Sequence, residues 1–319
     1  MRTQTRRQFL TTISLAGASG LAELCAGRKS LAAEPPLEVT TIRLAKDTVT
    51  CIAPLVLHEL LRAEGFTDIQ YIETTEEHIR RADAAKSGFA ADIIAHGEVD
   101  FARDFAPSLV LGMNAGAPIT ILTGLHLGCF EIFGKDEIRG LADLKGKTVG
   151  TMAAANAGER PLLTIMTSLV GLDPDKDLHW VSDPSLRPMD LFIEGKIDAF
   201  LAAPPSLQEV RAKNIGHVIT SSITDAPWSQ YYCCVLAANT EFVHKYPIAT
   251  KRALRAILKA VDFYASDPRR VAQLMVDGGF AARYDYAMQA LTEIRFDVGG
   301  NTTPRTRSVS MHCGCTRWA

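Results

Sequence analysis

Small and polar residues gather in four stretches of this chain, each placed where a predicted strand ends. The stretches are residues 47–49, 104–108, 153–158 and 203–205. Loops at the carboxyl ends of strands in an open α/β sheet surround its ligand cleft, and helix N-termini there favour anions through their unsatisfied N–H groups. Ordinary helix capping explains each stretch taken singly, but four of them together favour binding. We therefore expect a ligand to contact Asp47, Thr48, Phe105, Ser108, Asn156 and Pro204.

Two further candidates lie in an apolar segment, residues 118–134, which glycines and a histidine interrupt. The segment begins as a strand over 119–123, loosens over 124–128 and resumes over 129–133. Glycine within a strand marks a bend or the close approach of another group. We interpret the segment as a crossing from one α/β lobe into a second, which places His126 and Cys129 at the floor of the cleft. The alternative for His126 is a histidine packed in the core.

Aromatic residues accompany a second apolar segment, residues 229–238, with the sequence SQYYCCVLAA. We interpret this segment as the second crossing between the lobes. Trp228, Tyr231 and Tyr232 can form an aromatic wall of the cleft or pack in the core, and the sequence leaves both readings open. We assign Trp228 and Tyr231 to the expected ligand site.

The motifs predict no catalytic, cofactor or metal site. The sequence has no G-x-S-x-G elbow and no H-E-x-x-H pair, and the phosphate-loop-like GKT at 146–148 lacks the upstream glycine. The seven cysteines show no metal-binding spacing. Cys233 and Cys234 are adjacent in a predicted strand, so we expect them to point to opposite faces and to be buried as small apolar residues.

Strands and helices alternate along the chain, which predicts a mostly parallel sheet in each lobe. The predicted strands outside the crossings are residues 39–44, 69–73, 99–105, 148–151, 178–182, 197–202 and 217–220. The predicted helices are residues 51–64, 78–86, 106–114, 161–170, 188–194, 206–213 (capped by Ser206), 248–265, 269–277 and 284–292. The predicted fold class is α/β, with two lobes joined by two hinge strands and a cleft between them.

Composition and the N-terminus narrow the setting of the protein. The 319-residue chain is 47% hydrophobic and 22% charged, and its net charge of −2 argues against nucleic acid as the main partner. No apolar run reaches the roughly 20 residues that span a bilayer. Residues 5–10, TRRQFL, fit the twin-arginine export pattern, and an apolar region and small residues follow them. We expect residues 1–33 to be a cleaved signal peptide and the protein to reach the periplasm.

The last segment, residues 298–319, changes character abruptly. It has no apolar periodicity, it clusters threonine, serine and arginine, and it adds two cysteines. Codons for these residues can be chosen so that a shifted reading frame encodes a strongly helical continuation. We interpret the segment as the product of a frameshift that replaced C-terminal helices, with a natural disordered tail as the alternative. Sequencing the locus decides between the two.

Three motifs carry a resemblance to a known family. They are DLKGKTVG at 143–150, GKIDA at 195–199 and EVDF at 98–101. Together with the export signal, they resemble the nitrate/sulfonate/taurine branch of the periplasmic solute-binding proteins of ABC transporters, which includes the thiamine-pyrimidine-synthase-like domain. The resemblance implies a periplasmic binding protein type II fold. Residues 38–127 and 229–297 would form lobe 1, and residues 128–228 lobe 2.

The same resemblance implies a function. We expect a monomeric, non-enzymatic substrate-binding component that captures a small solute, such as a sulfonate, nitrate or taurine, by hinge closure. It would deliver the solute to a membrane permease with its ATPase and meet the membrane only through that permease. Few cations lie near the predicted cleft (Lys46, Arg103 and Arg160), so a neutral or amphipathic ligand also remains open.

One alternative has the same fold and a different function. It is a thiamine-pyrimidine (HMP) synthase-like enzyme, using His126 or Cys129 with an iron or pyridoxal cofactor, or a protein that binds a pyrimidine precursor. Export by the twin-arginine route argues against a biosynthetic enzyme.

Overall fold

The computed structural model of the chain describes residues 34–46, 54–85, 87–151, 159–182 and 187–296. The chain separates into Met1–Pro36 and Leu37–Ala319, and the fold below is that of the second unit. The expected signal peptide and the segment from 298 onward lie outside the described residues. Among the helices that are described, none has the length and apolar character needed to cross a bilayer.

The first sheet has five strands in the order β2-β1-β3-β10-β4. They are β1 (Thr41–Lys46), β2 (Asp68–Glu73), β3 (Phe101–Phe105), β4 (Ile119–Leu127) and β10 (Tyr232–Asn239). β10 runs antiparallel to both of its neighbours, while β1 is parallel to β2 and β3. β10 lies in the interior of the sheet and carries apolar residues on both faces: Val235 and Ala237 pack in one core, Leu236 and Ala238 in another.

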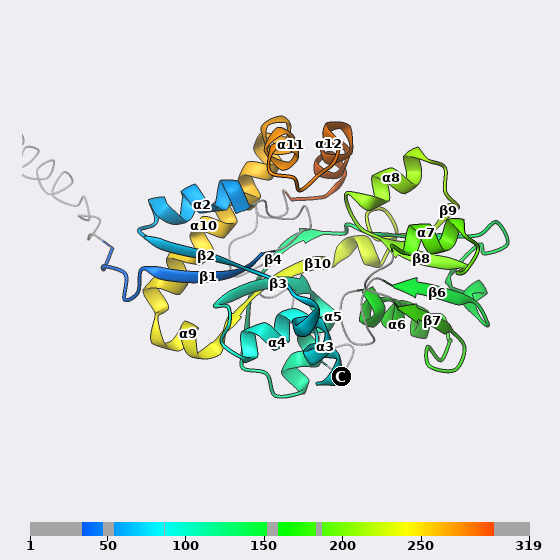
Figure 1. Cartoon of the computed structure of the whole chain (residues 1–319), viewed down its shortest axis with the longest axis horizontal. Helices are drawn as coiled ribbons and strands as arrows, with labels where there is room; N and C mark the ends of the chain where they lie inside the picture. The colour runs from blue at the N-terminus through cyan, green and yellow to red at the C-terminus, as the bar shows by residue number, and fades with distance from the viewer. Residues whose placement is uncertain (1–33, 47–53, 86, 152–158, 183–186, 297–319) are drawn as a thin grey trace, which may run out of the picture. The chain divides into compact units, whose positions relative to one another are not determined.

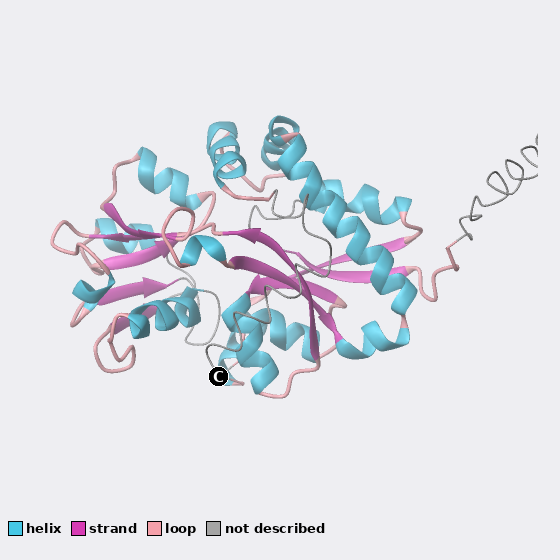
Figure 2. Cartoon of the chain, turned by 180° about the vertical axis from the view of Figure 1, so that it is seen from behind, coloured by secondary structure: helices cyan, strands magenta, loops and turns pink. Residues whose placement is uncertain are grey.

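Helices cover both faces of this sheet. α4 (Phe89–Ala95) and α5 (Ala106–Asn114) pack on one face, and α2 (Pro54–Ala63) and α10 (Pro247–Ser266) on the other. Figure 2 shows the long helix α10 from behind the view of Figure 1. The remaining helices of this part are α3 (Glu76–Ala84), α9 (Thr240–Lys245), α11 (Pro268–Asp277) and α12 (Tyr284–Glu293). The prolines at 247 and 268 stand at the first helical positions of α10 and α11, as predicted.

The second sheet repeats this plan in the order β7-β6-β8-β5-β9. Its strands are β5 (Glu131–Gly134), β6 (Thr148–Thr151), β7 (His179–Ser182), β8 (Ala199–Ala202) and β9 (His217–Ser221). The helices are η1 (Leu141–Leu144), α6 (Glu159–Leu169), α7 (Pro188–Ile193), α8 (Ser206–Ala212) and η2 (Trp228–Gln230). β5 alone is antiparallel to its neighbours. The antiparallel strands, β10 in the first sheet and β5 in the second, are therefore the strands by which the chain enters each sheet after a crossing. Two mixed sheets joined by two crossings confirm the predicted α/β fold class.

The first crossing lies later in the chain than predicted. β4 continues to Leu127 through the glycine at 124, and the interruption is Gly128–Phe130 instead of 124–128. A Cβ atom on Gly124 would lie 2.2 Å from the ring of Tyr232 on the neighbouring strand. Gly124 therefore marks the close approach of a side chain within an intact strand.

Three smaller predictions were wrong. The helix α4 was missed because it is short and most of its residues are buried, so it has no amphipathic period. The first strand begins at Thr41, two residues later than predicted. Ser206 lies inside α8, and Pro205 occupies the cap position.

Candidate functional site

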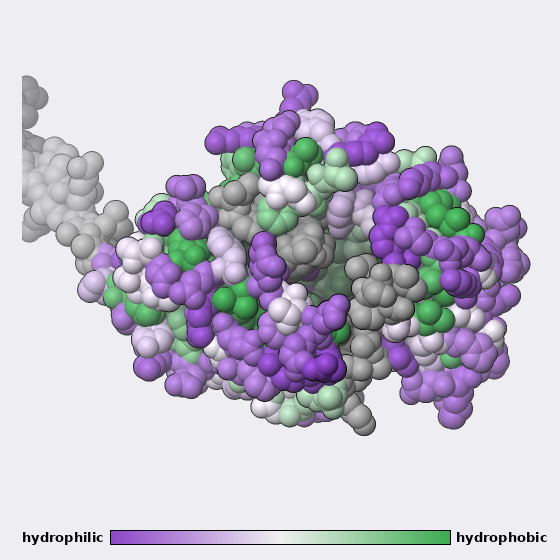
Figure 3. Space-filling view, in the orientation of Figure 1, coloured by the Kyte–Doolittle hydropathy of each residue, from purple (hydrophilic) through white to green (hydrophobic). Residues whose placement is uncertain are grey.

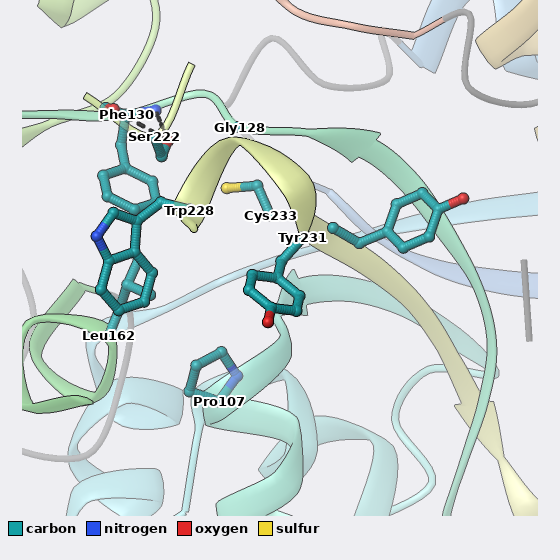
Figure 4. A pocket seen from close by; sticks show the side chains of 9 residues that line it. Pro107, Gly128, Phe130, Leu162, Ser222, Trp228, Tyr231 and Cys233 are labelled. Atoms are coloured by element: carbon teal, nitrogen blue, oxygen red, sulfur yellow. Dashed lines mark hydrogen bonds between the residues drawn. The ribbon is translucent and has the colours of Figure 1, made fainter. Parts of the chain in front are cut away.

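A pocket lies where the two sheets' helices and the two crossings meet. Its lining residues are Pro107, Gly128, Phe130, Leu162, Ser222, Trp228, Tyr231, Tyr232 and Cys233 (Figure 4). Pro107 belongs to α5 and Leu162 to α6, and these two helices contact each other across the sheets. The pocket encloses about 310 Å³ of empty space, open solvent included.

The two crossings are held together by Ser222. Its Oγ accepts hydrogen bonds from the amides of Cys129 and Phe130, each at 3.0 Å, and its own amide donates to the Phe130 carbonyl at 2.9 Å. Gly128 makes this approach possible because it adopts φ +40°, and a Cβ there would lie 2.0 Å from the Ser222 carbonyl oxygen. The floor of the pocket is therefore a hydrogen-bonded contact between the two connections.

Aromatic rings form much of the pocket wall. Phe130 meets Phe105 edge-to-face, with ring centroids 6.4 Å apart. Figure 4 draws Trp228, Phe130 and Leu162 on one side of the pocket and Pro107 below them. Tyr231 is 40% exposed, so its ring is available to a ligand. The lining is thus apolar and aromatic, with the hydroxyl groups of Ser222 and the tyrosines as its polar side chains.

An ion network crosses between the sheets beside the crossings. Arg211 on α8 donates from Nε to Oε2 of Glu131 at 2.8 Å, and from Nη1 to Oε1 of Glu293 on α12 at 2.8 Å. Glu131, the first residue of β5, is only 3% exposed. Its carboxylate holds the pKa of Arg211 above the usual range, chiefly through the side-chain hydrogen bond. The network joins α8 of the second sheet to α12, which follows the second crossing.

The structure places the expected ligand-site residues in three groups. Trp228 and Tyr231 line the pocket, and Phe105 contacts its lining residue Phe130. The buried ones are Ser108, whose Cβ lies 2.7 Å from a Cβ built on Gly88, and Pro204, His126 and Cys129. Asp47, Thr48 and Asn156 lie outside the described residues. All ten remain predicted ligand contacts.

Sequence reasoning missed part of the pocket lining. Gly128 and Phe130 lay within the predicted crossing, so the segment was found without its ligand-facing residues. Pro107 lies within the stretch 104–108 that was expected to border the cleft, whereas Leu162 carried no signal, because a leucine in an amphipathic helix is ordinary. Their role follows from the contact between α5 and α6.

Four residues that can bind a metal lie together beside the pocket, and one of them, Cys233, lines it. One ligand atom each from His126, Cys129 and Cys234 lies within 4.8 Å of the others, and all three side chains are buried. The Sγ atoms of Cys129 and Cys233 are 2.9 Å apart. The strand register between β10 and β4 shifts on both sides of Cys234, so both cysteines of the pair approach Cys129. Both cysteines are buried, as expected, and the strand is irregular where they lie.

Comparison with known proteins gives matches of low sequence identity. The nitrate import ATP-binding protein NrtC of Synechocystis sp. is 24% identical over 222 residues, which are 60% of this chain and 32% of that protein. This chain therefore spans about a third of the length of that relative. Two solved structures share the fold at 16% identity. One is the alkanesulfonate-binding protein SsuA from Xanthomonas axonopodis pv. citri bound to MOPS, with a TM-score of 0.62, covering 82% of this chain and 85% of that one.

The other solved structure is the periplasmic nitrate-binding protein NrtA from Synechocystis PCC 6803, with a TM-score of 0.63, covering 79% of this chain and 70% of that one. The two structures show that the chain has the fold of periplasmic binding proteins. A family model described as NMT1/THI5 like matches residues 82–271. Because that match covers more than half of the chain, the protein belongs to the NMT1/THI5-like family.

Proposed function

We propose that this protein is the substrate-binding component of an ABC importer. It captures a small organic solute in the pocket between α5 and α6 and delivers it to a membrane permease with its ATPase. The observation that carries the proposal is the origin of the lining: Pro107 comes from the first sheet's helices, Leu162 from the second's, and the remainder from the crossings. A solute in this pocket contacts both halves of the fold at once.

Contact with both halves gives a mechanism of capture. A ligand shifts an equilibrium between open and closed forms only by its different affinity for them, and contacts made by both lobes exist only in the closed form. The lobes in this proposal are residues 38–127 with 229–297, and residues 128–228. The role is binding without catalysis, and the protein acts as a monomer.

The lining favours a solute with an apolar part. Among the described lining residues there is no arginine, lysine or histidine. The cations expected near the cleft make other contacts: Lys46 pairs with Glu73, Arg103 lies 3.3 Å from Cys234 Sγ, and Arg160 stacks on Trp180 at 4.8 Å. Nitrate and bicarbonate need charged or N–H donors on all sides, whereas an alkyl or aryl sulfonate also offers a surface for the aromatic wall.

A pyrimidine is the second candidate solute. A flat heterocycle stacks well on aromatic side chains, and Phe130, Trp228 and Tyr231 provide them. In either case we place the protein in the periplasm, exported by the twin-arginine route. The Arg6-Arg7 pattern supports that location.

Isothermal titration of the full chain tests the proposal. The panel contains an alkanesulfonate, an arylsulfonate, taurine, nitrate, bicarbonate and hydroxymethylpyrimidine. We expect heat with an organic solute, and Tyr231→Ala to weaken that binding about tenfold, because losing contact with a ring costs on the order of 1.5 kcal/mol. Trp228→Ala should act in the same direction.

The matched control is Tyr284→Ala. Tyr284 on α12 is 41% exposed, as Tyr231 is 40% exposed, but it does not line the pocket. Its removal should leave the affinity unchanged. Absence of heat with every compound, or equal loss in the two tyrosine variants, would contradict the proposed site.

A further inference from the structure

Three buried side chains with soft or borderline donor atoms meet where the two crossings lie together. His126 is near the end of β4, Cys129 is in the first crossing, and Cys234 is near the start of β10, directly opposite His126 in the strand register. Each side chain is at most 1% exposed. Their ligand atoms lie within 4.8 Å of one another. The three residues come from the two segments that connect the sheets.

The spacing suits one metal ion. Metal–sulfur bonds of about 2.3 Å and metal–nitrogen bonds of about 2.0 Å put the donor atoms of a single site roughly 3.5–4 Å apart. Contraction from the present spacing, at most 4.8 Å, therefore requires movements of about 1 Å.

The donor set and the local charge select among metals. Two thiolates and one imidazole favour Cu(I) or Zn²⁺ over hard cations. Arg103 places its Nη1 atom 3.3 Å from the Cys234 Sγ. Cu(I) with two thiolates carries one net negative charge, which the half-buried guanidinium of Arg103 faces, whereas a divalent ion with two thiolates is neutral and gains less from that guanidinium. An uncompensated buried charge is costly.

We propose that His126, Cys129 and Cys234 bind one Cu(I) ion. The ion replaces the protons of the two thiols, which leave to solvent. Because Cys129 belongs to the first crossing and Cys234 to the second, the bound metal links the two connections. This inference is independent of the solute that the pocket captures.

Cys233 provides a competing reaction. Its Sγ atom is 2.9 Å from that of Cys129. Oxidation by a disulfide-containing oxidant would join the two sulfurs, release two protons and transfer two electrons to the oxidant, which is reduced to its dithiol. Cys129 would then no longer be available to the metal. The site should accordingly bind Cu(I) only while Cys129 is reduced.

The test is an anaerobic titration of the reduced full chain with Cu(I) in the presence of a chromogenic Cu(I) chelator. We expect one equivalent to be withheld from the chelator, and X-ray absorption to show sulfur and nitrogen neighbours in a ratio of two to one. A shell of nitrogen and oxygen alone, or no withheld copper, would overturn the proposal. So would stronger retention of Zn²⁺ than of Cu(I).

Variants assign the ligands. Cys233→Ser is the working background, because it removes the disulfide partner and should keep the full equivalent. In that background Cys129→Ser, Cys234→Ser and His126→Gln should each weaken Cu(I) binding at least 100-fold. His217→Gln is the control: this histidine is partly buried and bonds to the Ile138 carbonyl at 2.8 Å, away from the cluster, so binding should persist. Loss of binding in Cys233→Ser or in His217→Gln would refute the three-residue assignment, and the absorption measurement on the unmodified chain decides the case if a ligand variant does not fold.

Discussion

Replacing Gly128 with alanine tests how the two crossings are held together. The added Cβ would lie 2.0 Å from the Ser222 carbonyl oxygen and 2.6 Å from the Ser222 carbonyl carbon. Both atoms are backbone, so no side-chain rotation relieves the clash. The segments must separate, and Ser222 then loses its hydrogen bonds to the amides of Cys129 and Phe130.

The expected loss of stability is the sum of two contributions. A non-glycine residue at positive φ costs about 1 kcal/mol. Each buried amide that loses its partner costs about 1–3 kcal/mol. For Gly128→Ala, with two amides affected, we therefore expect a decrease in the free energy of unfolding of about 3–7 kcal/mol.

Gly97→Ala is the matched control. Gly97 also has a positive φ of +66°, but a Cβ there has nothing within 4 Å. It should cost only the backbone contribution of about 1 kcal/mol. Urea denaturation of both variants, followed by circular dichroism, measures the difference. If Gly128→Ala costs no more than Gly97→Ala, the crossings are not in close contact and the pocket floor described above is wrong.

Two other substitutions test the ion pairs of the fold. Arg211→Met leaves the carboxylate of Glu131 buried without its partner, so we expect the free energy of unfolding, measured by urea denaturation, to fall by about 2–4 kcal/mol. Adding Glu131→Gln should restore part of that loss. If the effects of the two substitutions simply add in the double variant, the pairing is contradicted. Glu64 is 6% exposed, and the hydrogen bond from Arg255 lowers its pKa below the usual 4.5. The ionised Glu64 carboxylate therefore stabilises the fold above about pH 4.5, and this stabilisation is lost as pH falls through the lower pKa of the folded state. The difference in free energy of unfolding between the unmodified protein and Glu64→Gln should accordingly shrink in acid. A difference that grows below pH 4.5 would refute the pairing.

The sequence predicted the elements whose pattern is local. The helices from Pro247 and Pro268 carry their start signals and apolar periodicity in the chain itself, and both were placed within one residue. β10 was recognised as a crossing because apolar residues fill both of its faces. α4 escaped because burial on all sides removes the period that identifies a helix.

The pocket was predictable only in part, because its walls come from segments far apart in the chain. Trp228 and Tyr231 stood out as aromatic residues beside a predicted crossing. Leu162 did not, since nothing in an amphipathic helix indicates which leucine faces a neighbouring lobe. The metal-binding cluster needed the register shift in β10, which places Cys233 and Cys234 near Cys129 and is a property of strand pairing.

Surface character agrees with a protein that works in water. Figure 3 shows hydrophilic residues over most of the described surface on one face, with smaller apolar areas among them. The apolar and aromatic residues of the pocket are therefore distinct from the general surface, which is the arrangement that a solute-binding site requires.

A crystal structure of the full chain with the best solute from the titration panel tests the central claim most directly. We predict electron density for one solute in the pocket, in contact with Pro107 on α5 and with Leu162 on α6 in the same molecule. A solute bound to only one of these helices, or bound elsewhere, would contradict capture between the two halves of the fold.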